Sequence, residues 1–401
     1  MSKAAAIAAD LAPALARRAS AVDVGAEFPR DSVAELRETG LFGLLVPAEY
    51  GGMGGDLADL AAAAAVLAGG CLSTAMIWAM HCQQVDVVVR HARDPLRSWL
   101  LSRIAEDGYY LASVTTEPGK GAHLLTAGSA LAAAGKQLIV HRDAPVVTGG
   151  EFADGFLVTM RAQENAPPNR VSLVHLDRRQ VEATVVRGWD AMGMRGTRSV
   201  GMVLSGTVPA DHVIGEPGEF RAVATDSMIP AGHLAWSACW LGAARAALDG
   251  TASLIRSPGR PSSLNPDSDL VRHRLARSRV DLELCGTYLQ AMCDEVLARR
   301  RSGLEPAEYG FQIRLNVLKV SCSELTFAAV DRLVQLCGAM TGYQRDAPVP
   351  LERHFRDLRS ASLNYSNDRL LTSIGALTVL DGAGAAAQAP GHDPGTSGTS
   401  D

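Results

Sequence analysis

The residue pattern of this chain changes twice along its length, and the two changes divide it into three parts. Residues 1–110 contain Ala- and Leu-rich stretches such as LADLAAAAAVLAGG, which are typical of buried helices. In residues 111–215 the segments are short and rich in Val, Thr and Gly, and several alternate polar with apolar residues, which predicts strands. Long helical stretches return in residues 216–382. The chain is therefore predicted to place a β domain between two helical domains.

This order favours an α+β fold. Turn sequences such as PGKG and NAPPN separate the expected strands, which predicts a small antiparallel barrel or sandwich. Four long helical stretches with short breaks follow, and they predict an antiparallel four-helix bundle. The last stretch, 383–401, is small, polar and rich in Gly and Pro, so we expect a disordered and dispensable tail.

Composition excludes several classes of protein. Of the 401 residues, 47% are hydrophobic and 20% are charged, which is typical of a globular chain rather than a disordered one. The net charge is −5 without a basic stripe, which argues against nucleic-acid binding. No apolar run approaches the roughly 20 residues of a membrane span. Asp10 and Pro13 break the N-terminal apolar stretch, so we expect an amphipathic helix rather than a signal peptide, and a cytoplasmic protein.

The seven cysteines are scattered and form no CxxC pair, so we expect buried free thiols in a reducing compartment and no metal site. The chain also lacks a P-loop, HExxH, GxSxG, and a GxGxxG after a strand. A classical nucleotide-binding fold is therefore not expected, and the cofactor of a redox enzyme built this way would sit between domains.

Four segments, in order, resemble signatures of the acyl-CoA dehydrogenase superfamily of flavoproteins. They are ELRETGLFGLLVPAEYGGMGGDL, SVTTEPGKGAHL (113–124), GWDAMGMRGTRSVGMVLSGTVPADHVIG (188–215) and VQLCGAMTGYQRDAPVPLERHFRDLRS (334–360). The resemblance runs from about residue 20 to 380. It implies the same three-domain order, an FAD cofactor shared between chains, and a homodimer or homotetramer.

The resemblance also implies which residues contact FAD. Hydroxyls and backbone groups near the TTEP segment would bond the flavin ring, and the glycines after it would let the backbone approach the pyrophosphate. Ala122 stands where the family usually has serine. The residues implied to contact the flavin of their own chain are Ser113, Thr115, Thr116, Gly121, Ala122 and Thr148. The residues implied to contact the phosphates and adenosine of FAD across a subunit interface are Arg256, Gln335, Gly338 and Ala339. Asn367 is also expected to bind the cofactor.

The sequence departs from the family at the catalytic base. The dehydrogenases use a carboxylate to remove the acidic α-proton of an acyl thioester. Aligning RDLR (356–359) with the family segment puts Tyr365 at or next to the usual Glu, and a neutral Tyr is a poor base at pH 7. Asp368 lies three residues further, on the same helix face, and could act as a displaced base. Tyr365 and Asp368 are therefore the candidate catalytic residues.

Three functions remain open from the sequence. The resemblance places first the α,β-dehydrogenation of an acyl thioester carried by CoA or an acyl carrier protein, with an electron-transfer partner. The missing Glu favours a flavin-dependent monooxygenase, which hydroxylates a small polar substrate with O2 and flavin reduced by a separate reductase. A non-catalytic subunit that completes the FAD site of a related chain is the third possibility.

Overall fold

The computed structural model describes residues 2–119 and 123–387. The N-terminal part is helical, as predicted. Ser2 caps the first helix, because its side chain accepts a hydrogen bond from the backbone N–H of Ala5. A capping box of Asp56 and Asp59 starts the Ala-rich helix α3. The helices are α1 (Lys3–Gly25), α2 (Arg30–Glu38), α3 (Leu57–Gly70), α4 (Leu72–His91) and α5 (Leu96–Asp107).

The middle part consists of two four-stranded sheets with the strand orders β1-β4-β5-β8 and β2-β3-β7-β6. This confirms the sandwich form of the prediction, but the sheets do not join into a barrel. One pair also differs from the expected antiparallel arrangement, because β1 and β4 are parallel: the chain crosses to the other sheet between them. The strands are β1 (Leu111–Val114), β2 (Ala132–Ala134), β3 (Gln137–Val147), β4 (Gly155–Arg161), β5 (Val171–Asp177), β6 (Val181–Arg187), β7 (Val200–Pro209) and β8 (Val213–Ile214).

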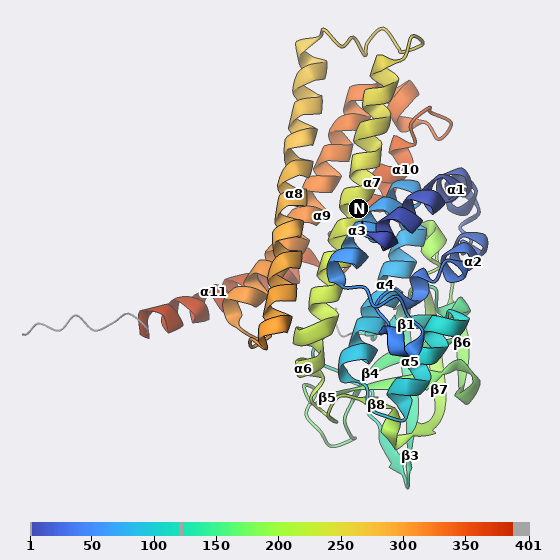
Figure 1. Ribbon diagram of the computed structural model, residues 1–401, viewed down its shortest axis with the longest axis vertical. Coiled ribbons are helices and arrows are strands. Elements are labelled where there is room, and N and C mark those ends of the chain that lie inside the picture. The colour runs from blue at the N-terminus through green and yellow to red at the C-terminus, as the bar shows by residue number, and fades with distance from the viewer. Residues whose placement is uncertain (1, 120–122, 388–401) are drawn as a thin grey trace, which may run out of the picture.

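Three long helices lie side by side in the C-terminal part (Figure 1). They run up, down and up, so that α7 begins near the sheets and ends at the far end of the bundle. Short π-helical turns, Ala224–Met228 and Ala339–Tyr343, precede α7 and follow α9. The helices are α6 (Phe220–Val223), α7 (Ile229–Arg256), α8 (Asp269–Ser302), α9 (Tyr309–Gly338), α10 (Leu351–Arg359) and α11 (Asn367–Ala387).

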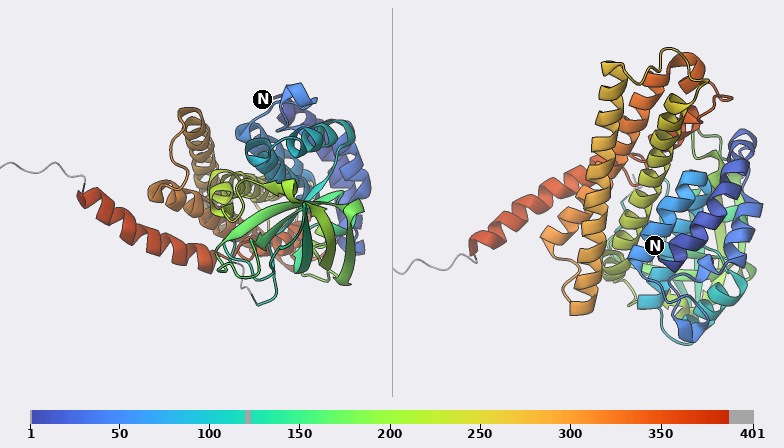
Figure 2. Two further views of the ribbon diagram at one scale, coloured as in Figure 1. Left: turned by 90° about the horizontal axis from the view of Figure 1, so that it is seen from below. Right: turned by 45° about the horizontal axis from the view of Figure 1, so that its top comes forward.

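The fourth long helix of the expected bundle is broken into α10 and α11. The break falls in the Ser-rich segment 360–366, where Tyr365 has a left-handed backbone with φ of 59°. After it, α11 packs its first turn against α9 and then extends away from the rest of the molecule (Figures 1 and 2). The helix continues to Ala387, so residues 383–387 are helical rather than part of a disordered tail, and the remainder of the expected tail lies outside the described residues.

The hydrophobic core is continuous through all three parts. Its centre is formed by α4 and α7, which are buried almost all round because other helices and the sheets cover them. Every cysteine of the chain is a buried free thiol, as predicted. Among the helices within the described residues, none is long and apolar enough to cross a bilayer.

Candidate functional site

A cavity of about 700 Å³ lies where α4, α7, the sheets and the 360–366 break meet. Its size falls in the range of roughly 300–1,000 Å³ that is usual for ligand pockets. Ser113, Thr115, Thr116 and Thr148, four of the residues expected to contact the flavin, line it. Tyr365, one of the two expected catalytic residues, lines it as well. The other two residues expected on this side, Gly121 and Ala122, lie outside the described residues.

One wall of the cavity carries a chain of hydroxyl groups. The Thr148 Oγ1 lies 3.0 Å from the Ser199 Oγ, which lies 2.8 Å from the Thr197 Oγ1. The Thr116 hydroxyl donates to the carbonyl of Val146 at 2.9 Å, so it joins the segment that follows β1 to β3 beside the same wall. Hydroxyls can donate and accept, so this wall suits the polar edge of a planar ring.

A buried ion pair supports the TTEP segment from behind. The Arg142 guanidinium lies 2.7 Å from the Glu117 carboxylate and donates to the carbonyl oxygen of Thr116 at 3.0 Å. The same carboxylate accepts the backbone N–H groups of Gly128 and Ser129. Burial lowers the pKa of Arg142 to about 10. The pair therefore fixes the backbone at the cavity wall.

The 188–199 loop is fixed by its contacts with α10. Met194 has a left-handed backbone, with φ of 54°, and its N–H donates to the Asp357 carboxylate at 2.5 Å. Its carbonyl accepts the Trp189 indole N–H and the Thr197 hydroxyl. A Cβ on Gly193 would lie 2.1 Å from the carbonyl oxygen of Arg356, so only glycine fits there.

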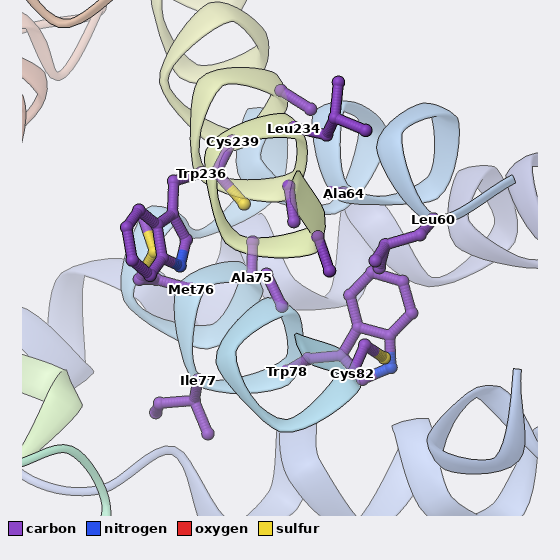
Figure 3. Close-up of a cluster of buried hydrophobic side chains, with 14 of the residues drawn as sticks. Leu60, Ala64, Ala75, Met76, Ile77, Trp78, Cys82, Leu234, Trp236 and Cys239 are labelled. Atoms are coloured by element: carbon purple, nitrogen blue, oxygen red, sulfur yellow. The ribbon is translucent and has the colours of Figure 1, made fainter. Parts of the chain in front are cut away.

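An aromatic cluster forms the opposite wall. The ring centroids of His233, Trp236 and Tyr365 lie 5.9 to 6.3 Å apart. Trp236 of α7 and Met76 of α4 reach the same region (Figure 3), and both line the cavity. Burial lowers the pKa of His233 to about 3 and raises the pKa of Tyr365, so both side chains are neutral at pH 7.

The second expected catalytic residue lies elsewhere. Asp368 is exposed in the first turn of α11 and does not line the cavity. Of the lining residues within 2–119 and 123–387, none is Asp or Glu. Asn367 is also outside the wall: its side chain is buried and bonds to Lys319, Ser323 and Glu324.

The residues expected at the adenosine half of FAD lie at the other end of the bundle. Trp240 lines the cavity from α7, and Arg256 follows it by sixteen residues on the same helix, which corresponds to about 24 Å. Arg256, Gln335 and Ala339 are exposed, and Gly338 has a φ of 71° where α9 ends. Within one chain these four residues are not brought to the cavity.

The cavity fits the ring system that the resemblance implies. The indole N–H groups of Trp236 and Trp240 are buried without an acceptor among the described residues, and both side chains line the cavity. A buried donor of this kind needs an acceptor, which a heteroaromatic ligand supplies. The hydroxyl wall and the apolar volume provide complementary groups for a flavin ring, and the two indole N–H groups on the opposite wall are left for an acceptor on a second ligand.

Sequence reasoning missed several residues of the site, three that line the cavity and one that lies behind its wall. Ser199 and Trp189 stand inside the quoted segment 188–215, so the motif itself could have identified them. Arg142 gave a weaker signal, a charged residue at an inward position of an alternating strand. Arg359 lines the cavity and is exposed, and its place at the end of the RDLR motif could have identified it.

Comparison with known families gives two matches in chain order. The model of the acyl-CoA dehydrogenase N-terminal domain matches residues 4–108. The model of the acyl-CoA dehydrogenase C-terminal domain matches residues 223–364. The two matches contain α4 and α7, which form one side of the cavity, and the second match ends at residue 364, just before Tyr365.

Similar proteins include enzymes of different reaction types. The probable acyl-CoA dehydrogenase YngJ of Bacillus subtilis is 24% identical over 91% of this chain and 94% of its own length. The amino sugar nitrososynthase DnmZ of Streptomyces peucetius is 27% identical over 88% and 86%. Among solved structures, the FMN-bound dibenzothiophene monooxygenase TdsC of Paenibacillus sp. A11-2 superposes with a TM-score of 0.84. It is 20% identical, and 94% of this chain and 98% of that chain are covered, which establishes the shared fold.

Proposed function

The chain belongs to the acyl-CoA dehydrogenase superfamily, and within it we propose that this protein is a flavin-dependent monooxygenase. The flavin oxidoreductase class follows from the family, and dehydrogenation and oxygenation both fit it. The observation that supports oxygenation is the carboxylate-free wall of the cavity among the described residues.

A dehydrogenase needs a base within reach of the substrate α-carbon. Tyr365 lines the cavity, but burial raises the pKa of its phenol further above neutrality. Asp368 is exposed on α11 and would have to move to reach the cavity. His233 has a pKa of about 3, so it is a weak base that accepts a proton poorly at pH 7. Oxygen transfer from reduced flavin removes no α-proton, so it does not require the missing group.

When bound, the flavin supplies the redox chemistry with O2 in this proposal. The chain's own residues would bind and orient the flavin and the substrate. Thr148, Ser199 and Thr116 hold the polar edge of the ring, and the Met194 peptide, fixed by Asp357, shapes the wall beside it. The Met and Trp side chains of α4 and α7 exclude water from the substrate half.

We propose FAD rather than FMN, in a homodimer or homotetramer. Arg256, Gln335, Gly338 and Ala339 lie too far from the cavity of their own chain to serve its flavin, and most of them are exposed. A partner subunit would bring its own copies toward the adenosine half. Arg256→Ala should therefore weaken FAD binding several-fold and leave FMN binding unchanged, measured by fluorescence titration. Sedimentation should give two or four chains, and a monomer with tightly bound FAD would contradict the shared site.

The second candidate is α,β-dehydrogenation of a CoA- or carrier-bound acyl thioester. Similarity to YngJ over nearly the whole chain favours it, and the neutral cavity wall accepts an uncharged thioester. Its electrons would leave through an electron-transfer partner, whereas the monooxygenase would receive them from a flavin reductase.

One experiment separates these candidates. The flavin-loaded protein is first mixed anaerobically with a set of acyl thioesters, and flavin absorbance is followed. The proposed function predicts no bleaching by any thioester and, after chemical reduction and admission of O2, a transient flavin–oxygen spectrum before reoxidation. Bleaching by a thioester that Asp368→Asn or Tyr365→Phe abolishes would establish dehydrogenation instead. A protein that binds no flavin would favour the partner-subunit role.

A further inference from the structure

A buried lysine lies directly behind the substrate half of the cavity. Lys319 of α9 has no exposed surface. Its Nζ donates to the carbonyl oxygen of Tyr365 at 2.9 Å and to Oδ1 of Asn367 at 2.7 Å. The same Nζ lies 5.5 Å from the centroid of the Trp240 ring. Tyr365 and Trp240 both line the cavity, so one layer of side chain separates the ammonium group from the ligand.

No acidic side chain on the wall offsets this charge within the described residues. Asn367 contributes a neutral amide to the bond with Lys319, and Glu324, which accepts from Asn367 at 3.0 Å, is exposed on the outer side. Two further cations, Arg356 and Arg359, line the cavity from α10. Arg356 is neutralised by Asp23 and Glu352, whereas Arg359 donates to the Ser362 hydroxyl. Asp357 bonds the lining residue Met194 from behind the wall and is mostly protonated below pH 6, so at that pH the charges nearest the cavity are positive.

Building on the proposed function, we propose that the substrate is an uncharged or anionic planar molecule that carries a hydrogen-bond acceptor, and that Lys319 excludes cations such as protonated amines. The rings of His233, Trp236 and Tyr365 are tilted by 43° to 67° to one another, so they offer both edge and face contacts to a planar aromatic body. The buried N–H groups of Trp236 and Trp240 suit an acceptor. A cation within several ångströms of Lys319 meets a like charge across a poorly solvated layer, which disfavours binding at least about tenfold.

The protonation of Lys319 gives the inference a pH signature. Burial lowers the pKa of Lys319 to about 7, and the Glu324 charge opposes that shift. The exclusion of cations should hold below pH 7 and fade above it, because neutral Lys319 no longer repels them. Asp357 on α10, with a pKa of about 6, also loses its proton in this range and would favour cations in the same direction, so the Lys319→Met variant is needed to separate the two groups. The other groups to consider are His233 on α7, Tyr365 in the break, Cys285 and Tyr288 on α8, Arg356 and Arg359 on α10, and Asp368 and Arg369 on α11. His233, with a pKa of about 3, stays neutral across this range.

The test measures ligand binding to the flavin-loaded protein by calorimetry, with three probes of one shape. 2-Naphthamide is neutral, 2-naphthoate is anionic, and 2-(aminomethyl)naphthalene is cationic. At about pH 5.5 the amide and the carboxylate should bind at least about tenfold more tightly than the amine. At about pH 8, where the amine is still mostly protonated and Lys319 is mostly neutral, the difference should shrink to a few-fold. Equal or tighter binding of the amine at the lower pH, or no binding by any probe, overturns the inference.

Two variants locate the effect. Lys319→Met should remove the discrimination at both pH values. Because that variant also removes two hydrogen bonds, Glu324→Gln provides a second test on the surface: it keeps an oxygen acceptor for Asn367 and removes the charge that supports protonated Lys319. The loss of discrimination should then begin at lower pH. An unchanged pH profile in Glu324→Gln, or full discrimination in a folded Lys319→Met protein, contradicts the role of Lys319. Binding requires no turnover, so these results can be read even if the oxygen reaction is absent.

Discussion

The Asp357 carboxylate accepts the backbone N–H of Met194 at 2.5 Å, and this bond joins α10 to the loop that shapes the cavity. Asp357 is buried, and burial raises its pKa to about 6, although the Met194 N–H and nearby arginines act in the opposite direction. The position of the cavity loop therefore depends on the carboxyl group of Asp357.

Asp357 should make stability depend on pH between about 4 and 6. The folded protein retains this proton to a higher pH than the unfolded chain, whose reference value is 3.8. The stability that Asp357 contributes is therefore fully present below pH 4 and is lost as pH rises through 6. Asp357→Asn keeps an oxygen acceptor and cannot ionise, so its Tm relative to the parent should rise from pH 4 to 7. A constant difference in Tm across that range would contradict the raised pKa.

Gly193→Ala should destabilise the protein by about 1–3 kcal/mol, because the new Cβ would meet the Arg356 carbonyl oxygen at 2.1 Å and force α10 away from the loop. Flavin should also bind less tightly to this variant. Gly188→Ala is the matched control in the same loop, since a Cβ there meets nothing within 4 Å. Thermal unfolding of both variants checks the prediction, which fails if they unfold at the same temperature.

Thr148→Val and Ser199→Ala should each weaken flavin binding about two- to tenfold, the equivalent of roughly 0.5–1.5 kcal/mol for one hydrogen bond. The two hydroxyls lie 3.0 Å apart, so the double variant should lose less than the sum of both effects. Thr184→Val on the exposed strand β6 is the control. Flavin fluorescence titration provides the dissociation constants, and unchanged constants in the double variant would remove these residues from the site.

Glu117→Gln should cost about 3 kcal/mol of folding stability, because it leaves the fully buried Arg142 guanidinium without a compensating charge. Glu164→Gln breaks the exposed pair with Arg161 and should cost less than about 1 kcal/mol. Urea unfolding of the two variants measures both. Similar losses in the two would mean that the buried pair does not support the TTEP segment as we describe.

Local motifs in the sequence select residues that the structure brings to one cavity. Ser113, Thr116 and Thr148 stand in short signatures whose backbone shape is set by nearby residues, and all three line the cavity, while their contact with flavin stays a prediction. The three-part order of the fold followed from the change between helical and alternating patterns, because that periodicity reflects which face of each element is buried.

The pairings between distant segments could not be predicted in the same way. Lys319 stands in an apolar helix and gives no local sign that its ammonium group will meet Tyr365, forty-six residues later. The break between α10 and α11 depends on Tyr365 taking a left-handed conformation that its side chain disfavours. These features result from tertiary contacts, and a hydrophobic pattern does not record which polar group will meet which.

The burial of all seven cysteines affects which side chains of this protein would be oxidised first. A flavin site that uses oxygen, as proposed, would release some peroxide. The thiols of this chain lie inside the core, where burial raises the pKa of Cys82, Cys239 and Cys293 and so suppresses their reactive thiolates; Cys285 is the exception, because a hydrogen bond with Cys322 lowers its pKa. Met76, Met80, Met192, Met194 and Met228 instead line the cavity itself. Oxidation would therefore affect mainly the methionine thioethers around the ligand. Enzyme activity would then decline while the protein stays folded, and reduction of the methionine sulfoxides could restore the activity.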